Sequence, residues 1–368
     1  MAQVRADALA NYAEVARFCG LDPYRMLRRV GLRAEILTQP ALPIPIERGA
    51  LLLELSARES GCAGFALLMV QCRILSDLGP ISLLLEHEGT ARDVIDALVR
   101  YQALLGTMLA VSIEEENETT IIRTELATAS VGPQAIELLT GLVCRTMSEL
   151  ADCKWQPETV HFVHAAPDDL SVHRRIFPCP IVFESEFNGM VCATASLAAP
   201  NPRAEAAMAG YAAAYLDLLA TEQGETSLTE QTRRALFLLV PAGRATLGEA
   251  AATLGLHPRR LQRSLERAGS SFAALLNEVR RELAQRYLAT SPLDITAISL
   301  MMGYASPSSF TRWFTGEFGI SPAAWRADIA ERPPLRTSPA RVRSSAKGRA
   351  VRGPSPPAAS LAAPRRGA

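Results

Sequence analysis

The chain has 368 residues, 48% of them hydrophobic, and its 38 basic residues balance 38 acidic ones. This length allows more than one domain. No apolar run approaches the roughly 18 residues that cross a membrane, and charged residues such as Arg5, Asp7 and Glu14 interrupt the start of the chain, so we expect no signal peptide there. We therefore expect a cytoplasmic protein that does not span a membrane.

The neutral total conceals an uneven distribution of charge. Residues 1–228 hold 17 basic and 29 acidic side chains (net −12), residues 229–330 hold 12 and 8 (net +4), and residues 331–368 hold 9 and 1 (net +8). An acidic front and a basic rear indicate that only the rear binds a polyanion. The stretch from residue 331 is also rich in proline and small residues, so we expect a disordered basic tail.

Helices and strands alternate irregularly through the first 220 residues. Apolar residues at helical spacing, bounded by N-cap residues, glycines and prolines, predict helices at about residues 11–19, 23–30, 47–59, 90–105 and 133–150. Runs of β-branched and alternating residues predict strands at 109–115, 119–126, 159–165, 181–183 and 189–194. The irregular order predicts an α+β domain rather than a doubly wound sheet.

Cysteine and histidine patterns do not indicate a metal site. Seven cysteines are scattered without C-x-x-C spacing and are interpreted as reduced core residues, with a redox-sensing pair as an alternative: Cys19, Cys62, Cys72, Cys144, Cys153, Cys179 and Cys192. His161 and His164, with His173 nearby, invite a zinc interpretation. Because an i, i+3 pair on a strand points to opposite faces, we interpret them as ordinary strand histidines.

No catalytic motif stands out in the front domain. The G-x-G-x-x-G, G-x-x-x-x-G-K-[ST], H-E-x-x-H and G-x-S-x-G patterns are absent from the sequence, and we expect no catalytic residue and no cofactor. The string from Ser344 to Lys347 matches S-x-x-K but lies in the tail, which cannot hold a nucleophile in place. Cys179 lacks the basic neighbours that a reactive, alkyl-accepting cysteine needs.

A helix at about residues 204–221 carries Met208, Tyr211, Tyr215 and Leu218 on one stripe at roughly heptad spacing. This stripe either pairs with its copy in a homodimer or packs on its own domain, and the sequence does not decide between the two. The polar residues 221–228, which include Gly224, follow as the predicted linker.

Beyond the linker, the spacing predicts a first helix-turn-helix. Thr246 and Glu249 form a capping box, and Gly255 ends the first helix. The second helix starts at His257 and Pro258, buries leucines, and turns Arg259, Gln262 and Arg263 outward. Arg and Gln read guanine and adenine edges by paired hydrogen bonds. An arginine-rich solvated face remains the alternative, and His257 stands where a serine would cap the helix more rigidly.

A long apolar stripe then predicts a spacer helix that begins after Ser271. About 19 residues of helix are roughly 28 Å long. Recognition helices that enter successive major grooves lie about 34 Å apart. The spacer therefore allows one subunit to span two grooves.

A second helix-turn-helix follows at residues 294–318. Asp294 caps its first helix, Gly303 ends that helix, and Ser306 with Pro307 starts the next one. Four aromatic residues fall on one face of that helix and polar residues on the other. Over both units, the residues predicted to contact DNA are Arg259, Gln262, Arg263, Ser308, Ser309, Thr311 and Arg312.

The C-terminal motif supports a family resemblance. GYASPSSFTRWFTGEFGISPAAWR resembles the C-terminal signature of AraC/XylS-type transcription regulators, and the resemblance implies a further helix-turn-helix just upstream, where the first unit is predicted. WQPETVHFVHAAPDD, followed by HRRIFPCPIVFESEFNGMV, resembles the arabinose-binding-like effector domain on one branch of that family. LDPYRMLRRVGL and LSDLGP resemble it too, so the likeness covers nearly all of residues 15–220.

The resemblance implies an effector and dimerisation domain at 1–220, a linker at 221–228, an all-α DNA-binding domain at 229–330 with two helix-turn-helix units joined by a long helix, and the tail at 331–368. We expect an effector-responsive activator of transcription that binds double-stranded DNA, a small molecule of unknown identity and RNA polymerase, as a homodimer. Two alternatives remain, namely a DNA-tethered enzyme or repair protein and an architectural DNA-binding protein whose front domain only dimerises.

Overall fold

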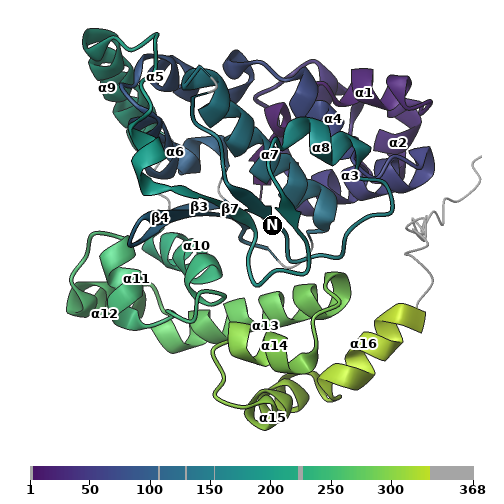
Figure 1. Cartoon of the computed structure of the whole chain (residues 1–368). Coiled ribbons are helices and arrows are strands. Elements are labelled where there is room, and N and C mark those ends of the chain that lie inside the picture. The colour runs from purple at the N-terminus through teal and green to yellow at the C-terminus, as the bar shows by residue number, and fades with distance from the viewer. Residues whose placement is uncertain (1–2, 107, 129–130, 153, 223–226, 332–368) are drawn as a thin grey trace, which may run out of the picture. The chain divides into compact units, whose positions relative to one another are not determined.

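The computed structural model describes residues 3–106, 108–128, 131–152, 154–222 and 227–331 (Figure 1). These residues belong to one compact unit, 1–332. Within them, no helix is long and apolar enough to cross a membrane. Residues 332–368 of the predicted tail and residues 223–226 of the predicted linker lie outside the described residues.

In Figure 1 the helices of the front domain lie above a small sheet, and helix α10 (Leu228–Leu239) of the C-terminal part lies below it. Helices and strands follow one another in the irregular order that the sequence predicts. The helices that the structure describes in this domain are α1 (Tyr12–Phe18), α2 (Pro23–Arg29), α3 (Ile46–Ser60), α4 (Phe65–Cys72), α5 (Ile81–His87), α6 (Ala91–Leu105), α7 (Pro133–Leu150), α8 (Ser171–Ile176) and α9 (Ala206–Glu222).

The sheet has the strand order β3-β4-β7-β5-β6 and is antiparallel except for the pair β5 and β6. Its strands are β3 (Leu109–Glu116), β4 (Thr119–Leu126), β5 (Thr159–His161), β6 (Ile181–Val182) and β7 (Gly189–Ala193). The hairpin between β3 and β4 turns at Asn117, which adopts a positive φ of 57°. A separate pair joins β1 (Gln3–Arg5) to β2 (Pro43–Pro45).

One predicted strand is shorter than expected. The strand predicted for residues 159–165 ends at His161, because toward β7 the backbone N–H of Val163 donates to the side chain of Asn188 (2.9 Å). On the other side Phe162 still donates to the carbonyl oxygen of Val182 (2.9 Å). His164 is therefore not the ordinary strand histidine that we expected, and its side chain is buried against helix α7.

The C-terminal part is all helical and confirms the predicted fold class. Its helices are α10 (Leu228–Leu239), α11 (Leu247–Thr253), α12 (Pro258–Arg267), α13 (Phe272–Thr290), α14 (Ile295–Met301), α15 (Pro307–Phe318) and α16 (Pro322–Glu331). Thr246, Ser271, Asp294 and Ser306 cap their helices as predicted, each accepting a backbone N–H three residues on. The capping box at Thr246 is only half formed, because the carboxylate of Glu249 pairs with Arg244 at 2.5 Å.

The core of the C-terminal part extends into the front domain. Ile46, Met108, Ala127 and Val163 of the front domain pack in one cluster with the buried residues of α10 to α15. Helix α10 packs on β3 and β4 on one side and on α11 and α12 on the other. A buried apolar cluster therefore joins the sheet to the first helix-turn-helix.

Candidate DNA-binding surface and effector cavity

A glycine in the left-handed conformation forms the turn of each helix-turn-helix. Gly255 follows α11 with φ +64°, and Gly303 follows α14 with φ +76°. A side chain at either position would be strained, and next to Gly303 the guanidinium of Arg280 also lies 3.2 Å from where a Cβ would be. The two turns therefore require glycine, and they set the angle between the helices of each unit.

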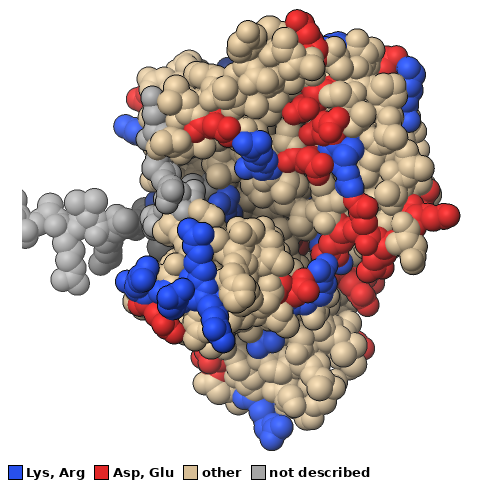
Figure 2. Space-filling view, turned by 90° about the vertical axis from the view of Figure 1, so that its left-hand side faces the viewer, with Lys and Arg blue, Asp and Glu red and all other residues tan. Residues whose placement is uncertain are grey.

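The first recognition helix, α12, exposes the residues predicted to read bases. Leu261 and Leu265 are buried, while Arg259, Gln262 and Arg263 are exposed. Gln262 donates one N–H to Glu266 one turn later (3.2 Å), and its amide oxygen is not used in this bond. The side of α11 and α12 faces the viewer in Figure 2, where a group of basic side chains projects from the lower half.

The second recognition helix, α15, exposes smaller side chains. Ser308 and Arg312 are exposed, whereas Ser309 and Thr311 are half-buried. The hydroxyls of Ser308 and Ser309 lie 3.1 and 3.0 Å from that of Ser306, so they share the hydrogen-bond network of the N-cap. Of the four predicted contacts on this helix, Arg312 and Ser308 are the most accessible.

Aromatic packing and one polar network fix α15 in place. Phe310 and Phe314 are fully buried, and the ring of Phe314 meets Trp325 of α16 at 5.7 Å. The indole of Trp313 donates to Asn277 of α13 at 2.8 Å, and Asn277 donates to Glu317 at 3.1 Å. The second recognition helix is therefore held on both sides, by α13 and by α16.

An apolar cavity of about 160 Å³ lies inside the front domain. Leucines and other aliphatic side chains from α3, α6 and α7 form most of its wall, and the ends of β3 and β4 close one side with Met108, Leu109 and Leu126. The sequence carries no local signal for this cavity, because its wall combines segments far apart in the chain. Mostly apolar cavities with a few polar groups are typical of small-molecule sites.

The cavity has one charged end. Arg73, only 4% exposed, donates through Nη2 to the carbonyl oxygens of Asp7 (3.0 Å) and Ala8, while its Nε has no hydrogen-bond partner among the described residues. Burial lowers the pKa of Arg73, and the nearby Asp77 and Asp7 oppose that effect. Arg5 pairs with Asp7 at 2.8 Å. Two cations and two carboxylates therefore line this end of the cavity.

The wall formed by the ends of β3 and β4 also contacts the DNA-binding part. The carbonyl oxygen of Leu126 accepts from Arg286 of α13 (3.0 Å), and that of Ala127 accepts from Arg233 of α10 (2.6 Å). Arg233 also lies 3.6 Å from the sulfur of Met108. A molecule in the cavity and the helices α10 and α13 would therefore touch opposite sides of the same short segment.

A buried ion pair crosses this contact. Arg286 Nη2 donates to Glu125 Oε2 at 2.6 Å, and the two side chains are 4% and 5% exposed. The other oxygen of Glu125 accepts from Asn188 at 2.8 Å. Because both oxygens of the buried Glu125 carboxylate accept hydrogen bonds, they hold the sheet and α13 in a defined relative position. Removing Arg286 would leave the charge of Glu125 buried and uncompensated.

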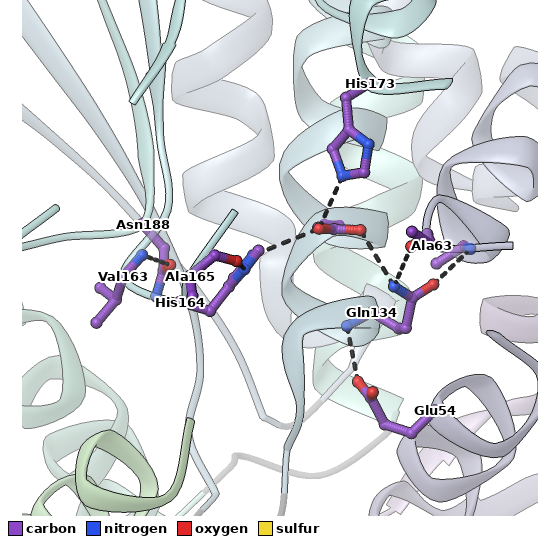
Figure 3. Close-up of polar contacts among 10 residues, drawn as sticks. Glu54, Ala63, Gln134, Val163, His164, Ala165, His173 and Asn188 are labelled. Atoms are coloured by element: carbon purple, nitrogen blue, oxygen red, sulfur yellow. Dashed lines mark hydrogen bonds and ion pairs between the residues drawn. The ribbon is translucent and has the colours of Figure 1, made fainter. Parts of the chain in front are cut away.

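Figure 3 shows a second polar cluster, which joins α3, α7, α8 and the segment after β5. Its centre is Glu137, 1% exposed, which accepts from His173 at 2.9 Å and lies 3.4 Å from His164. Burial lowers the pKa of His164, and Glu137 opposes this. Among the residues that the structure describes, no group of three or more His, Cys, Asp or Glu side chains is arranged to hold a metal ion.

Glu54 lies at the edge of this cluster and faces a cleft of about 350 Å³. Its carboxylate accepts the backbone N–H of Gln134 at 2.8 Å. Burial raises the pKa of Glu54 to about 7, the hydrogen bond from Gln134 opposes this, and the charge of Glu137 adds to it. The carboxyl groups and histidines therefore tie α3, α8 and the segment after β5 to α7.

The cysteines that the structure describes carry free thiols. Cys19 and Cys62 interact, and burial, with a smaller contribution from Cys62, raises the pKa of Cys19 to about 11. A thiol with a raised pKa holds little of the reactive thiolate at neutral pH. This does not favour the redox-sensing alternative at this pair.

Three of the four residues predicted for the stripe on α9 face outward, and the fourth, Met208, is half-buried. Tyr211, Tyr215 and Leu218 are 74%, 49% and 55% exposed, while Ala212 and Leu216 on the opposite side are buried. Helix α9 packs on α5 and α6 of its own domain through that opposite side. In the part of the chain that the structure describes, no helix or strand covers Tyr211, Tyr215 and Leu218, so these side chains are accessible to a partner.

Two sequence profiles match the chain in succession. The arabinose-binding domain of AraC transcription regulators, N-terminal, matches residues 20–201, and a helix-turn-helix domain matches residues 250–328. These are the two domains that the resemblance predicts, in the same order.

Known proteins are similar to the chain over different shares of its length. The HTH-type transcriptional regulator VirS of Mycobacterium tuberculosis is 26% identical over 328 residues, which cover 88% of this chain and 96% of VirS. The transcriptional activator NphR of a Rhodococcus species is 29% identical over 141 residues, 35% of this chain and 42% of NphR. The crystal structure of the transcriptional regulator CdpR from Pseudomonas aeruginosa aligns with a TM-score of 0.39 and 20% identity, over 83% of this chain and 97% of CdpR.

The predicted resemblance and fold class are thereby confirmed. An effector-type domain precedes two helix-turn-helix units whose recognition helices expose polar side chains, and the matches cover both parts. The chain is a DNA-binding transcription regulator and belongs to the AraC family.

Proposed function

We propose that the chain is an effector-responsive activator of transcription, in which a small molecule held by the front domain changes how the two helix-turn-helix units bind DNA. The observation that carries this proposal is the double role of the segment at Met108, Leu126 and Ala127. Met108 and Leu126 line the cavity, and the carbonyl oxygens of Leu126 and of the adjacent Ala127 accept hydrogen bonds from α13 and α10.

A ligand acts through such a segment only if it binds one arrangement of the two parts more tightly than another. An occupied cavity would press on Met108 and Leu126 from the inside. Arg233 and Arg286 hold the outer side of the same segment, and Arg233 is itself paired with Glu282 of α13 at 2.6 Å. A shift at the wall would therefore be passed to α10 and α13, which position both recognition helices.

The proposed contacts to DNA are Arg259, Gln262, Arg263, Ser308, Ser309, Thr311 and Arg312. Their support is the position of all seven on α12 and α15, each of which starts just after a turn glycine. Arginine and glutamine on α12 suit guanine and adenine edges, and short hydroxyls on α15 suit close approach to the groove.

Activation, RNA polymerase as a protein partner and a cytoplasmic location belong to the same proposal. NphR carries the word activator in its name. An activator bound beside a promoter acts by contact with the polymerase. No enzymatic step is part of the proposed mechanism.

We also propose a homodimer formed through α9. Its support is the exposed stripe of Tyr211, Tyr215 and Leu218, which the helix does not use to pack on its own domain. Two tethered copies bind paired half-sites more tightly than one copy does. The variant Tyr215→Glu should shift the protein from dimer to monomer in analytical ultracentrifugation, and an unchanged mass would remove the α9 interface.

The domain division at residues 221–228 is tested by a fragment of residues 225–330. We expect it to fold alone and to bind the operator more weakly than the full chain. In the fragment, Arg233 and Arg286 lose their partners on the sheet. A fragment that does not fold would therefore show that the DNA-binding part depends on the front domain.

The effector response is tested in the full chain. A compound that binds only the folded state raises its stability by RT ln(1 + [L]/Kd), about 2.7 kcal/mol at a hundredfold excess over Kd, so a thermal-shift screen should find it. Operator affinity and transcription are then measured with and without that compound. A stabilising compound that changes neither readout would refute the regulatory response.

A further inference from the structure

We infer that the front-domain cavity binds an uncharged, mostly apolar molecule about the size of one substituted aromatic ring, whose single hydrogen-bond acceptor is held by Arg73. The inference deepens the proposed function, because it names the chemical class of the effector. Binding in the cavity and a response at DNA are separate measurements, so each can fail without the other.

The size of the cavity limits the ligand to a small molecule. Its volume is about 160 Å³. An apolar cavity of about 150 Å³ engineered into another protein stays dry and binds benzene. A single ring with a short substituent is therefore the scale of molecule that this cavity accepts without repacking.

The wall determines that most of the ligand is apolar. Leu53, Leu98, Leu139 and Leu142 line the cavity from three helices, and Met108 and Leu126 line it from the sheet. Contact with such side chains releases ordered water and contributes in proportion to the apolar area buried. A sugar or an amino acid would leave several polar groups without partners against this wall.

The donor at the charged end is Arg73. One of its nitrogens, Nη2, is already bound to two carbonyl oxygens, but Nε is buried and has no partner among the described residues. A buried donor without a partner is rare in folded proteins, and a ligand acceptor would satisfy it. We therefore expect the ligand to carry one hydrogen-bond acceptor, which binds the N–H of Arg73 Nε.

The charges around that end favour an uncharged acceptor over a carboxylate. Arg5 and Arg73 contribute two positive charges, and Asp7 and Asp77 contribute two negative ones to the same end of the cavity. A ligand carboxylate would gain Arg73 but meet Asp7 and Asp77, and it would also lose its hydration. A carbonyl or ether oxygen accepts from Nε without that cost.

Three probes with nearly the same skeleton test this inference, namely acetophenone, ethylbenzene and benzoate. Isothermal titration of the full chain should rank acetophenone first, about tenfold or more tighter than ethylbenzene, because the hydrogen bond is made to a charged donor. Benzoate should bind most weakly. Tightest binding by benzoate would overturn the uncharged class, and no binding by any of the three would overturn the site.

Cavity variants show where the probe binds. Ala50→Phe fills the cavity and should abolish acetophenone binding, whereas Ala57→Phe on the same helix lies outside the cavity wall and should leave it unchanged. If Ala50→Phe does not fold, Leu139→Ala tests the same site by enlarging the cavity. It should move the preference from acetophenone to the longer butyrophenone, and the matched Leu52→Ala, buried but outside the wall, should not.

Arg73→Lys tests the polar end while keeping the positive charge. We expect the advantage of acetophenone over ethylbenzene to fall to about twofold or less, because lysine cannot supply the donor at Nε. The ratio of the two affinities cancels any general loss of stability in the variant. An unchanged ratio would remove Arg73 from the site.

The same samples separate this inference from the proposed function. If acetophenone binds in the cavity and operator affinity stays unchanged, the ligand class stands and the proposed response fails. If the probes do not bind while an unrelated compound changes operator affinity, the response stands and the cavity inference fails.

Discussion

The two helix-turn-helix units share one plan but are held in different ways. In the first, two leucines are the only residues of α12 that are fully buried, and its outward side chains are large and charged. In the second, two buried phenylalanines, two tryptophans and Phe318 pack around α15, and its outward side chains are mostly small. The recognition helix of the first unit therefore has few buried contacts and exposes large charged side chains. The recognition helix of the second unit has many buried aromatic contacts and exposes mostly small polar side chains.

The two units also differ in their neighbours. Helix α10 packs both on the sheet and on α11 and α12. Arg244, just before α11, lies 3.8 Å from Glu114 of β3 and 2.5 Å from Glu249 of α11. The second unit packs instead on α13 and α16. The first unit is thus the one whose position depends directly on the front domain, and we expect an effector to act mainly on it.

The largest expected effect is on the aromatic anchor. Phe314→Ala should destabilise the chain by about 3–5 kcal/mol, and Leu265→Ala in the first unit by about 2–5 kcal/mol, because each leaves a cavity in a packed core. Hydrogen exchange should show faster opening of α15 and α16 in Phe314→Ala and of α11 and α12 in Leu265→Ala. Opening of both units together in either variant would show that they do not differ in anchoring.

The next effect is on the contact that joins the sheet to α13. Arg286→Met should cost about 3–5 kcal/mol in urea unfolding, because Glu125 keeps its charge in a buried place without its partner. The double variant Arg286→Met/Glu125→Met should recover most of that loss, since two apolar side chains can pack where the ion pair was.

The double variant also tests the coupling. It should bind operator but respond less to any compound that stabilises the front domain. A full response in the double variant would mean that Arg233 and α10 alone carry the signal. The single variant Arg286→Lys, which keeps the charge but not both hydrogen bonds, is the matched control.

A smaller effect is expected at the base-reading arginines. Arg263→Ala and Arg312→Ala should each weaken binding to the operator by about 1–3 kcal/mol, and binding to random DNA by less. Arg260→Ala, on the exposed side of the same helix as Arg263, is the control that should act through phosphate contact. Electrophoretic mobility shifts at several salt concentrations give both quantities.

The losses measured for Arg263→Ala and Arg312→Ala compare the first helix-turn-helix unit with the second. Equal losses on operator and random DNA would mean that the arginines contact only phosphate. Binding that does not weaken with salt would argue against phosphate contact altogether, since bound phosphates release counterions.

The sequence predicted the DNA-binding part well because its signals are local. Each cap, turn glycine and apolar stripe lies within a few residues of the element that it defines, as Ser306 and Gly303 do for α15. The longer front-domain helices and the strands of the main sheet were also predicted for the same reason, whereas α4, α5, α8 and the pair of β1 and β2 were not. The strand at 159–165 was overestimated because Asn188, far along the chain, takes the hydrogen bond of Val163.

The cavity and the contact between the two parts could not be predicted in this way. Glu125 and Arg286 are 161 residues apart, and neither stands in a motif. Arg73 resembles a surface arginine until α4 and the segment at Asp7 are brought together. Such sites arise from tertiary packing, and a single sequence without aligned relatives carries no signal for them.

The smallest expected effect concerns the N-caps, which differ between the two recognition helices. His257 Nδ1 accepts the backbone N–H of Arg259 at 3.3 Å, while the hydroxyl of Ser306 accepts that of Ser309 at 3.3 Å and contacts two further hydroxyls. Serine is among the preferred N-caps, so Ser306→Ala should cost about 1 kcal/mol and His257→Ser should stabilise α12 by about 0.5 kcal/mol. Thermal unfolding of the full chain measures the first change, and hydrogen exchange of the first turn of α12 measures the second.

A better-ordered α12 should also raise operator affinity, by no more than about twofold. If His257→Ser instead weakens operator binding while stabilising the helix, the imidazole itself contacts DNA, and the first unit reads its site with one more residue than proposed.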